Sequence, residues 1–191
     1  KGSPTEIVRS RRIRTLKDIA AAMVQLDKFS SDQGGSMIFD DQNSPIGVGP
    51  ALFLNSPAML NRLRNDDPDE LAIYLEAGPF EDPTEYYTVI LDSRKDGQEY
   101  GREDAGTSFE RGLLSLLRLL IAWIREPAPT NGNQKPFVLE HPDMDIQNFL
   151  VDEDGALQAI IDWDGVGYAP RSLGNRRYPS FLTRDWDPAM Y

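Results

Sequence analysis

Residues 141–148 read HPDMDIQN, and residues 159–164 read AIIDWD. The first stretch places Asp143 and Asn148 in the spacing His-x-Asp-x4-Asn, and the second is a short apolar run that ends in Asp162. A phosphoryl-transfer site needs one Asp that orients the attacking hydroxyl and accepts its proton. It also needs oxygen ligands for the magnesium ion that shields the phosphate oxygens, and Asn and Asp supply them. Together the two stretches predict a phosphoryl-transfer site.

The residues around this motif predict a loop held between short strands. Residues 137–139 are apolar and read as a strand, and residues 148–151 and 157–161 read as two more. The Asp-Gly pair at 154–155 separates the last two, which is typical of a β-hairpin. Asp143 would then lie on a loop with rigid neighbours, as catalytic residues often do.

Each of the three principal residues has an alternative interpretation. Asp143 is a candidate general base, or else an Asp that caps a turn after a proline. Asn148 is a candidate magnesium ligand, or else a polar residue at the start of a strand. Asp162 follows two isoleucines, where a buried carboxylate would be costly without a cation, and this favours a metal ligand over the alternative, a surface role.

Other polar residues near the motif have supporting roles in this interpretation. His141 is the only histidine, and we interpret it as a structural residue that holds the loop by hydrogen bonds. A single histidine also argues against a metal-dependent hydrolase with several nitrogen ligands. Asp145 and Asp164 either support the ligands or face the substrate, or else they are solvated acids of the loop, which is the favoured interpretation of each.

Upstream of the motif the sequence predicts two long helices. Residues 1–14 are basic and begin a helix or an arm. Thr15 to Asp18 has the pattern of a helix N-terminal capping box, and apolar residues follow at helical spacing through residues 19–26. Residues 108–125 form the strongest predicted helix, because their apolar residues recur on one broad face.

Shorter elements are expected between and after these helices. Residues 37–39 and 46–53 read as a hairpin or a pair of extended segments. Ser56 and Asp82 each precede a proline and are plausible helix starts. Residues 168–191 are rich in Pro, Arg and Trp and are expected to form helical turns or loop.

Composition limits the classes of function. The chain has 191 residues, enough for one compact domain, and no cysteine, which excludes disulfides and zinc-thiolate sites. Its net charge is −11, with 13 acidic and three basic residues in the segment 65–104. Such a chain is a poor partner for nucleic acid or an anionic membrane, whereas a cationic small-molecule substrate suits it. No apolar run approaches the length of a membrane span and no secretory signal opens the chain, so we expect no membrane partner and a cytoplasmic location.

Residues 136–164 resemble the catalytic and metal-binding segments of the aminoglycoside phosphotransferase (APH) family, which includes choline kinase-like enzymes. Earlier segments, at residues 16–29, 35–39 and 48–50, are similar to uncharacterised fungal members. The resemblance implies small-molecule kinase activity with Mg²⁺ and ATP (or GTP) as cofactors.

By the same resemblance Asp143 would be the catalytic residue, and Asn148 with Asp162 would bind the metal and the cofactor. The sequence departs from the family in two places. Asp145 stands where many members have a second histidine, and Asp164 stands where many have Glu after the Trp. Neither departure changes Asp143, Asn148 or Asp162, the residues with the three principal roles.

The resemblance also predicts the fold class, which is α+β, mainly α. Residues 1–191 would form the C-terminal lobe of a protein-kinase-like fold, with short β-hairpins around the catalytic loop. The family's N-terminal nucleotide lobe has no counterpart upstream of Leu16, so we expect that lobe of the same protein to be the missing partner. The isolated chain is therefore expected to have little or no ATP turnover.

Three interpretations of function follow from the sequence. The first is a phosphotransferase lobe that transfers the γ-phosphate of a nucleoside triphosphate to a hydroxyl of a small cationic molecule. The second is a pseudokinase or binding module that keeps the fold without turnover. The intact set of Asp143, Asn148 and Asp162 argues against it. The third, a metal-dependent hydrolase, conflicts with the single histidine.

Overall fold

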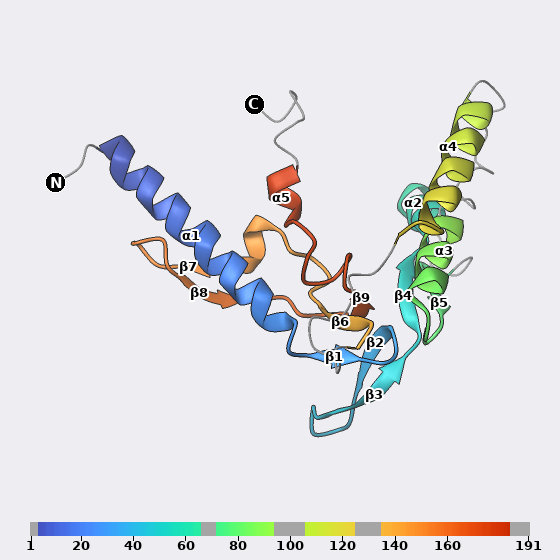
Figure 1. Cartoon of the computed structure of the whole chain (residues 1–191), viewed down its shortest axis with the longest axis horizontal. Coiled ribbons are helices and arrows are strands. Elements are labelled where there is room, and N and C mark those ends of the chain that lie inside the picture. The colour runs from blue at the N-terminus through green and yellow to red at the C-terminus, as the bar shows by residue number, and fades with distance from the viewer. Residues whose placement is uncertain (1–3, 66–71, 94–105, 125–134, 184–191) are drawn as a thin grey trace.

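A computed structural model of the chain describes residues 4–65, 72–93, 106–124 and 135–183 (Figure 1). Helices are interspersed among groups of strands along the sequence. In chain order these elements are α1 (Pro4–Leu26), β1 (Ser30–Ser31), β2 (Gly35–Phe39), β3 (Pro45–Gly49), β4 (Ala51–Leu54), α2 (Ser56–Asn65), β5 (Tyr74–Ala77), α3 (Pro83–Ser93), α4 (Gly106–Ile121), β6 (Phe137–Glu140), the 3₁₀ helix η2 (Ile146–Asn148), β7 (Phe149–Val151), β8 (Leu157–Ile160), β9 (Gly167–Pro170) and α5 (Ser180–Thr183).

A five-stranded antiparallel sheet lies at the centre, in the order β1-β6-β9-β2-β3. In Figure 1 it separates α1 and the β7–β8 hairpin on one side from the group formed by α2, α3, α4, β4 and β5 on the other. Glu140, the last residue of β6, is paired with Gly167, the first residue of β9. This pairing brings the chain just after β6 close to the chain just before β9, and both parts of the sequence motif lie there.

The helix α1 runs without a break from Pro4 to Leu26, so a helix start at Thr15 is wrong. The basic residues before Thr15 are themselves good helix formers, and they extend the helix backwards. The Thr15 hydroxyl instead lies 3.1 Å from the main-chain oxygen of Arg11 and 2.7 Å from that of Gly155. Asp18 accepts a hydrogen bond from the main-chain N–H of Leu157 at 3.2 Å.

The two residues that resembled a capping box therefore join α1 to the β7–β8 hairpin. The hairpin itself is confirmed, with Phe149 paired to Ile160 and the turn at residues 152–155. Gly155 has φ +78° and lies against the backbone of Arg11, so the turn is in close contact with the helix.

The expected helices on the other side of the sheet are confirmed. α2 begins at Ser56, where Asn55 accepts a hydrogen bond from the Ala58 N–H at 3.2 Å. α3 begins after Asp82, whose carboxylate accepts from the Thr84 N–H at 2.8 Å. The helix expected at residues 108–125 is α4, which starts two residues earlier and ends at Ile121.

Two apolar clusters hold these elements together. The first lies between the sheet and α3, and the second lies between α1 and the β7–β8 hairpin. The buried members of the first are Ala51, Phe80, Tyr86, Phe137 and Ala169. The buried members of the second are Ile19, Met23 and Phe149, with Met144 and Phe181 packed against them. The second cluster lies directly behind the motif loop, because Met144 belongs to that loop.

The expectation for residues 168–191 is wrong in its first part. Residues 167–170 form β9, which lies in the middle of the sheet between β6 and β2. A strand that reads GYAP has little β-propensity, and its place comes from tertiary contacts with both neighbours. Turns follow, then the short helix α5, and residues 184–191 lie outside the described part.

The fold class is a mixture of helices and antiparallel strands, as the α+β prediction requires. In the part of the chain that the structure describes, no helix combines the length and the apolar character that a membrane span needs.

Candidate active site

His141 lies at the centre of the motif and is buried, with 3% of its surface exposed. Its Nδ1 accepts a hydrogen bond from the main-chain N–H of Asp143 at 3.1 Å. Its Nε2 therefore carries the proton and donates to the main-chain oxygen of Ile161 at 2.9 Å. The ring also contacts Trp163 edge to face, with centroids 4.6 Å apart. These contacts hold the loop against the segment that carries Asp162.

Asp143 is exposed, and two amides hold its side chain. The Asn148 Nδ2 donates to the Asp143 main-chain oxygen at 2.7 Å and to its Oδ2 at 3.1 Å. The Gln147 Nε2 donates to the same Oδ2 at 3.0 Å. Both bonds converge on one carboxylate oxygen, so the other is open for a further partner. Sequence reasoning did not single out Gln147, although its position between two motif residues was a possible signal.

Asn148 is buried, with 3% exposure, and is fixed through its backbone as well. Its main-chain N–H donates to the Asp145 oxygen and its main-chain oxygen accepts from the Ile161 N–H, each at 3.0 Å. Since Nδ2 faces Asp143, Oδ1 lies on the other side of the amide. Among the described residues this Oδ1 accepts no hydrogen bond.

Asp145 is buried at 4% exposure, so its interpretation as a solvated loop acid is wrong. Its carboxylate accepts from the Ile146 N–H at 2.7 Å and thereby caps the N-terminus of η2. A carboxylate at a helix start satisfies a main-chain donor that would otherwise have no partner. Asp145 thus shapes the turn that presents Asn148.

Asp162 is exposed, which corrects the expectation of a carboxylate buried at a strand end. It follows β8 with φ +65°, a left-handed conformation in which Asp is tolerated better than most residues. The chain turns here, so the side chain leaves the apolar face of the strand. Within the described ranges the carboxylate has no hydrogen-bonding or ionic partner. Asp164, in the next turn, is exposed as well, in accord with a solvated acid.

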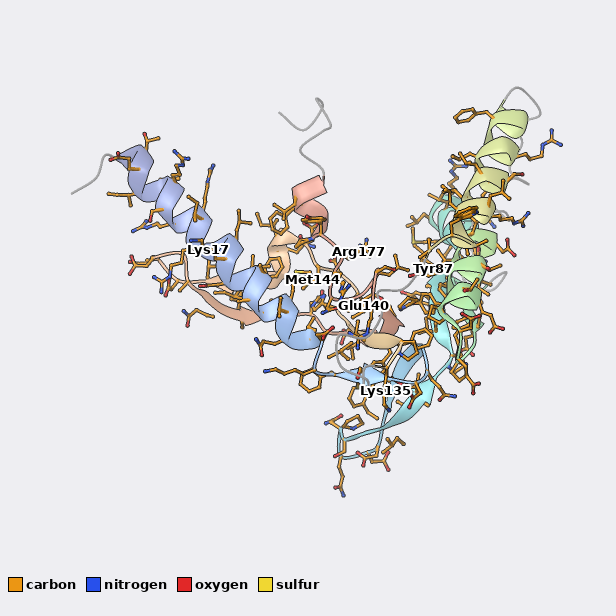
Figure 2. The ribbon with its side chains drawn as sticks, viewed as in Figure 1. Lys17, Tyr87, Lys135, Glu140, Met144 and Arg177 are labelled. Atoms are coloured by element: carbon orange, nitrogen blue, oxygen red, sulfur yellow. The ribbon has the colours of Figure 1, made fainter. Side chains whose placement is uncertain are left out.

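A cavity of about 170 Å³ lies beside Asp143, between the end of α1, the motif loop and the turn at residues 173–177. Glu140 and Arg177 line it, and Figure 2 shows both near Met144 in the middle of the molecule. Glu140 is 22% exposed and forms a 3.7 Å ion pair with the more exposed Arg177. Burial raises the pKa of Glu140 to about 7, although the Arg177 charge lowers it. Sequence reasoning missed Glu140, since an acid inside an apolar strand gives no motif.

The family model of the phosphotransferase enzyme family, APH, matches residues 59–173, which is more than half of the chain and includes the whole motif. The chain belongs to the APH family. No curated protein and no solved structure matches it significantly.

Membership in the APH family makes the chain a phosphotransferase, a kinase-type enzyme, in general reaction class. The matched region begins after the segments at residues 16–29, 35–39 and 48–50, so the similarity of those segments to fungal members remains an expectation.

The residues that the APH resemblance assigns to magnesium fit that ion in chemistry. Asn148 and Asp162 offer a neutral and an anionic oxygen, each without a protein partner among the described residues. Magnesium commonly takes one or two carboxylates and keeps several waters. In the described part no three His, Cys, Asp or Glu residues gather into a metal-binding group, so these side chains do not form a complete set of metal ligands.

Proposed function

We propose that this chain supplies the catalytic base, Asp143, of an enzyme that transfers the γ-phosphate of ATP or GTP to a hydroxyl of a small cationic molecule, and that the chain alone has little or no turnover. In this proposal residues 1–191 form the catalytic lobe of a kinase-like enzyme. The observation that carries it is the arrangement of Asp143: an exposed carboxylate, held through one oxygen by two amides, at the edge of a cavity.

The hydrogen bonds at Asp143 define what it does. Asn148 and Gln147 both donate to Oδ2, which orients the carboxylate and leaves Oδ1 for the acceptor hydroxyl. A base positioned in this way takes the hydroxyl proton as the oxygen attacks phosphorus, and it aligns that oxygen with the leaving group. In phosphoryl transfer most of the rate comes from such positioning and from charge stabilisation.

Asn148 and Asp162 are the residues that would hold the metal. When bound, magnesium neutralises charge on the phosphate oxygens. The chain's own part is to fix the ligands: the backbone hydrogen bond from the Ile161 N–H to the Asn148 oxygen sets the position of Asp162 next to the loop. The left-handed turn at Asp162 then directs the carboxylate to solvent, where the triphosphate would bind.

The negative charge of the chain supports a cationic acceptor. The chain carries −11 overall, and residues 135–165 hold eight acidic residues against one lysine. Clustered carboxylates raise the local concentration of cations and oppose anions.

The test is magnesium-dependent nucleotide binding, measured by calorimetry with a non-hydrolysable ATP analogue. Asp162→Asn keeps the shape and tolerates the left-handed backbone, so it removes the charge alone. Asp164→Asn is the matched control, because it makes the same change in an exposed acid two residues away. We expect magnesium-dependent binding in the wild-type chain and in Asp164→Asn, and its loss in Asp162→Asn. Equal binding by all three would refute the assignment of Asp162.

A further inference from the structure

The helix α4 is apolar on two of its sides. Its main neighbour is α3, and Figure 1 shows both helices at the edge of the molecule, away from α1. On one side of α4 the half-buried Leu117 and Ile121 border a groove that they share with α3. Another side carries large apolar residues that are exposed. We call these the α4 seam, and they are Phe109, Leu113, Leu116, Leu120 and Trp123.

The residues of the α4 seam recur at intervals of four, three, four and three. Helical geometry continues to the last of them, because the Ile124 N–H donates to the Leu120 oxygen at 3.0 Å. Such a repeat keeps the side chains on one line along the helix, which is the pattern by which two helices pack lengthwise. Arg118 lies on the opposite face, where it forms a 2.9 Å ion pair with Asp92 of α3. The line itself is therefore uncharged, as the core of an interface is.

The exposed apolar surface is large enough for a specific interface. Trp123 is 81% exposed and Phe109 is 74% exposed, and the exposed Leu119 and Ile124 flank the α4 seam. A helix that is apolar on both of its faces is normally buried on both. Seven such side chains, with on the order of 100 Å² exposed on each, supply roughly 700 Å² per copy, which is close to the ~800 Å² that each partner buries in a standard interface.

The order of residues along the α4 seam is symmetric about Leu116. The two aromatic residues, Phe109 and Trp123, lie seven residues on either side of it, and Gly112 and Leu120 lie four residues on either side. A Cβ at Gly112 would have nothing within 4 Å, so the surface of α4 has a gap there. A second α4, turned end for end, would place its aromatic ends against those of the first and its Leu120 in this gap. A twofold interface requires this kind of self-complementary surface.

We propose that two copies of this chain form a dimer through the α4 seam, with antiparallel α4 helices and Leu116 against Leu116 on the twofold axis. The antiparallel orientation also pairs opposite ends of the two helix dipoles. The groove between α3 and α4, of about 530 Å³, continues the α4 seam at Trp123 and receives Phe109 of the second copy. No residue of this groove lines the cavity beside Asp143, so the dimer and the phosphotransfer stand or fall separately.

Sedimentation equilibrium of the full chain measures the association. We expect a dimer with a Kd on the order of 10 µM, as a short interface of standard size allows. Each copy carries a net charge of −11, and salt screens the repulsion between the copies. The Kd should therefore fall about threefold or more as NaCl rises from about 0.05 M to about 0.5 M. A chain that stays monomeric at ten times the expected Kd, or a Kd that rises with salt, would overturn the proposal.

Substitutions at Leu116 test the twofold axis, because this residue meets its own copy. Leu116→Glu and Leu116→Lys should each raise the Kd about 100-fold or more, since each places two like charges together. An equal mixture of the two variants should form a dimer again, which misfolded chains would not do. Leu16→Glu, the same change in an exposed leucine of α1 across the sheet, is the control and should leave the dimer intact. A dimer that survives Leu116→Glu, or a mixture that stays monomeric, would contradict this interface.

The orientation of the helices is tested by cross-linking, since the chain has no cysteine of its own. Gly112→Cys chains mixed with Leu120→Cys chains should form disulfide-linked dimers under mild oxidation, because the antiparallel arrangement brings these two positions together. Either variant alone should give few of them. Non-reducing gel electrophoresis measures the yield. Efficient linkage within each variant alone, without linkage between them, would show parallel helices and would refute the antiparallel arrangement.

Discussion

The Nε2–H of His141 donates to the main-chain oxygen of Ile161 at 2.9 Å, across 20 residues of sequence. The acceptor belongs to the residue just before Asp162, and the other ring nitrogen accepts from the Asp143 N–H. One imidazole thus fixes the distance between the candidate base and the candidate metal ligand. The neutral ring with its proton on Nε2 satisfies both bonds, and a protonated ring would lose the acceptor at Nδ1.

Replacing His141 by Ala should lower the free energy of unfolding by about 2–4 kcal/mol, because it removes two buried hydrogen bonds and the contact with Trp163. Urea unfolding monitored by tryptophan fluorescence measures the change. Asp164→Ala is the control and should stay within about 0.5 kcal/mol of wild type. A His141→Ala variant as stable as the control would show that the ring does not hold the loop.

Asn148→Asp should destabilise the chain by about 2 kcal/mol or more at pH 8. It loses the hydrogen bonds that Asn148 donates to the main-chain oxygen and to Oδ2 of Asp143, and it places a second carboxylate against that of Asp143. Asn148→Ala loses the same bonds but adds no repulsion, so its effect should be smaller. Unfolding of both variants at pH 8 and pH 5 tests whether Asn148→Asp is less stable than Asn148→Ala. The difference between them should shrink at the lower pH, where two neighbouring carboxylates share a proton. A constant difference would contradict repulsion as its cause.

Two substitutions at Asp162 separate the effect of its backbone conformation from the effect of its carboxylate. Asp162→Ala should be about 1 kcal/mol less stable than Asp162→Gly, because alanine is strained at φ +65° and glycine is not. Both should lose magnesium-dependent nucleotide binding to the same extent. Thermal unfolding and calorimetry on the pair provide the two readouts, and unequal loss of binding would mean that strain, rather than the carboxylate, governs the site.

Stability should fall as pH rises from about 4.5 to about 7, through the titration of Glu140. Its folded pKa is raised to about 7 from the ordinary value of 4.5, so between these values the folded state holds a proton that the unfolded state releases. The contribution is on the order of 1–3 kcal/mol, present below pH 4.5 and lost as pH passes 7. Unfolding across pH 4–9 should show this slope in the wild type and a flatter profile in Glu140→Gln. Identical profiles would contradict the shift.

Gly155→Ala should destabilise the chain by about 1–3 kcal/mol. A Cβ at this position would lie 2.6 Å from the main-chain oxygen of Arg11, and φ is +78°. Gly47→Ala, where a Cβ would have nothing within 4 Å, is the matched control. Urea unfolding compares them, and equal effects would show that the turn does not press on α1.

The motif loop and its hairpin were predictable because their signals are local. Asp143 and Asn148 lie in one continuous stretch, and an Asp-Gly turn between apolar runs specifies a hairpin without help from the rest of the chain. The helix starts at Ser56 and Asp82 were predictable for the same reason.

What sequence reasoning missed depends on contacts between distant segments. β9 has weak β-propensity and becomes a strand through β6 and β2 on its two sides. Thr15 and Asp18 match a capping pattern, yet they bind the hairpin 139 or more residues away. Asp162 was expected to be buried because its neighbours are apolar, and one left-handed residue reversed that outcome.

Glu140 borders a second cavity, of about 190 Å³, on the side of β2 and Tyr168. One carboxylate therefore contributes to the electrostatic potential of two separate spaces. A cation bound in either cavity would neutralise the negative charge of Glu140, which attracts cations to the other cavity as well. Binding in one cavity would therefore weaken binding in the other. By thermodynamic linkage that antagonism must be equal in both directions. A molecule that never touches Asp143 could in this way act as an inhibitor of acceptor binding.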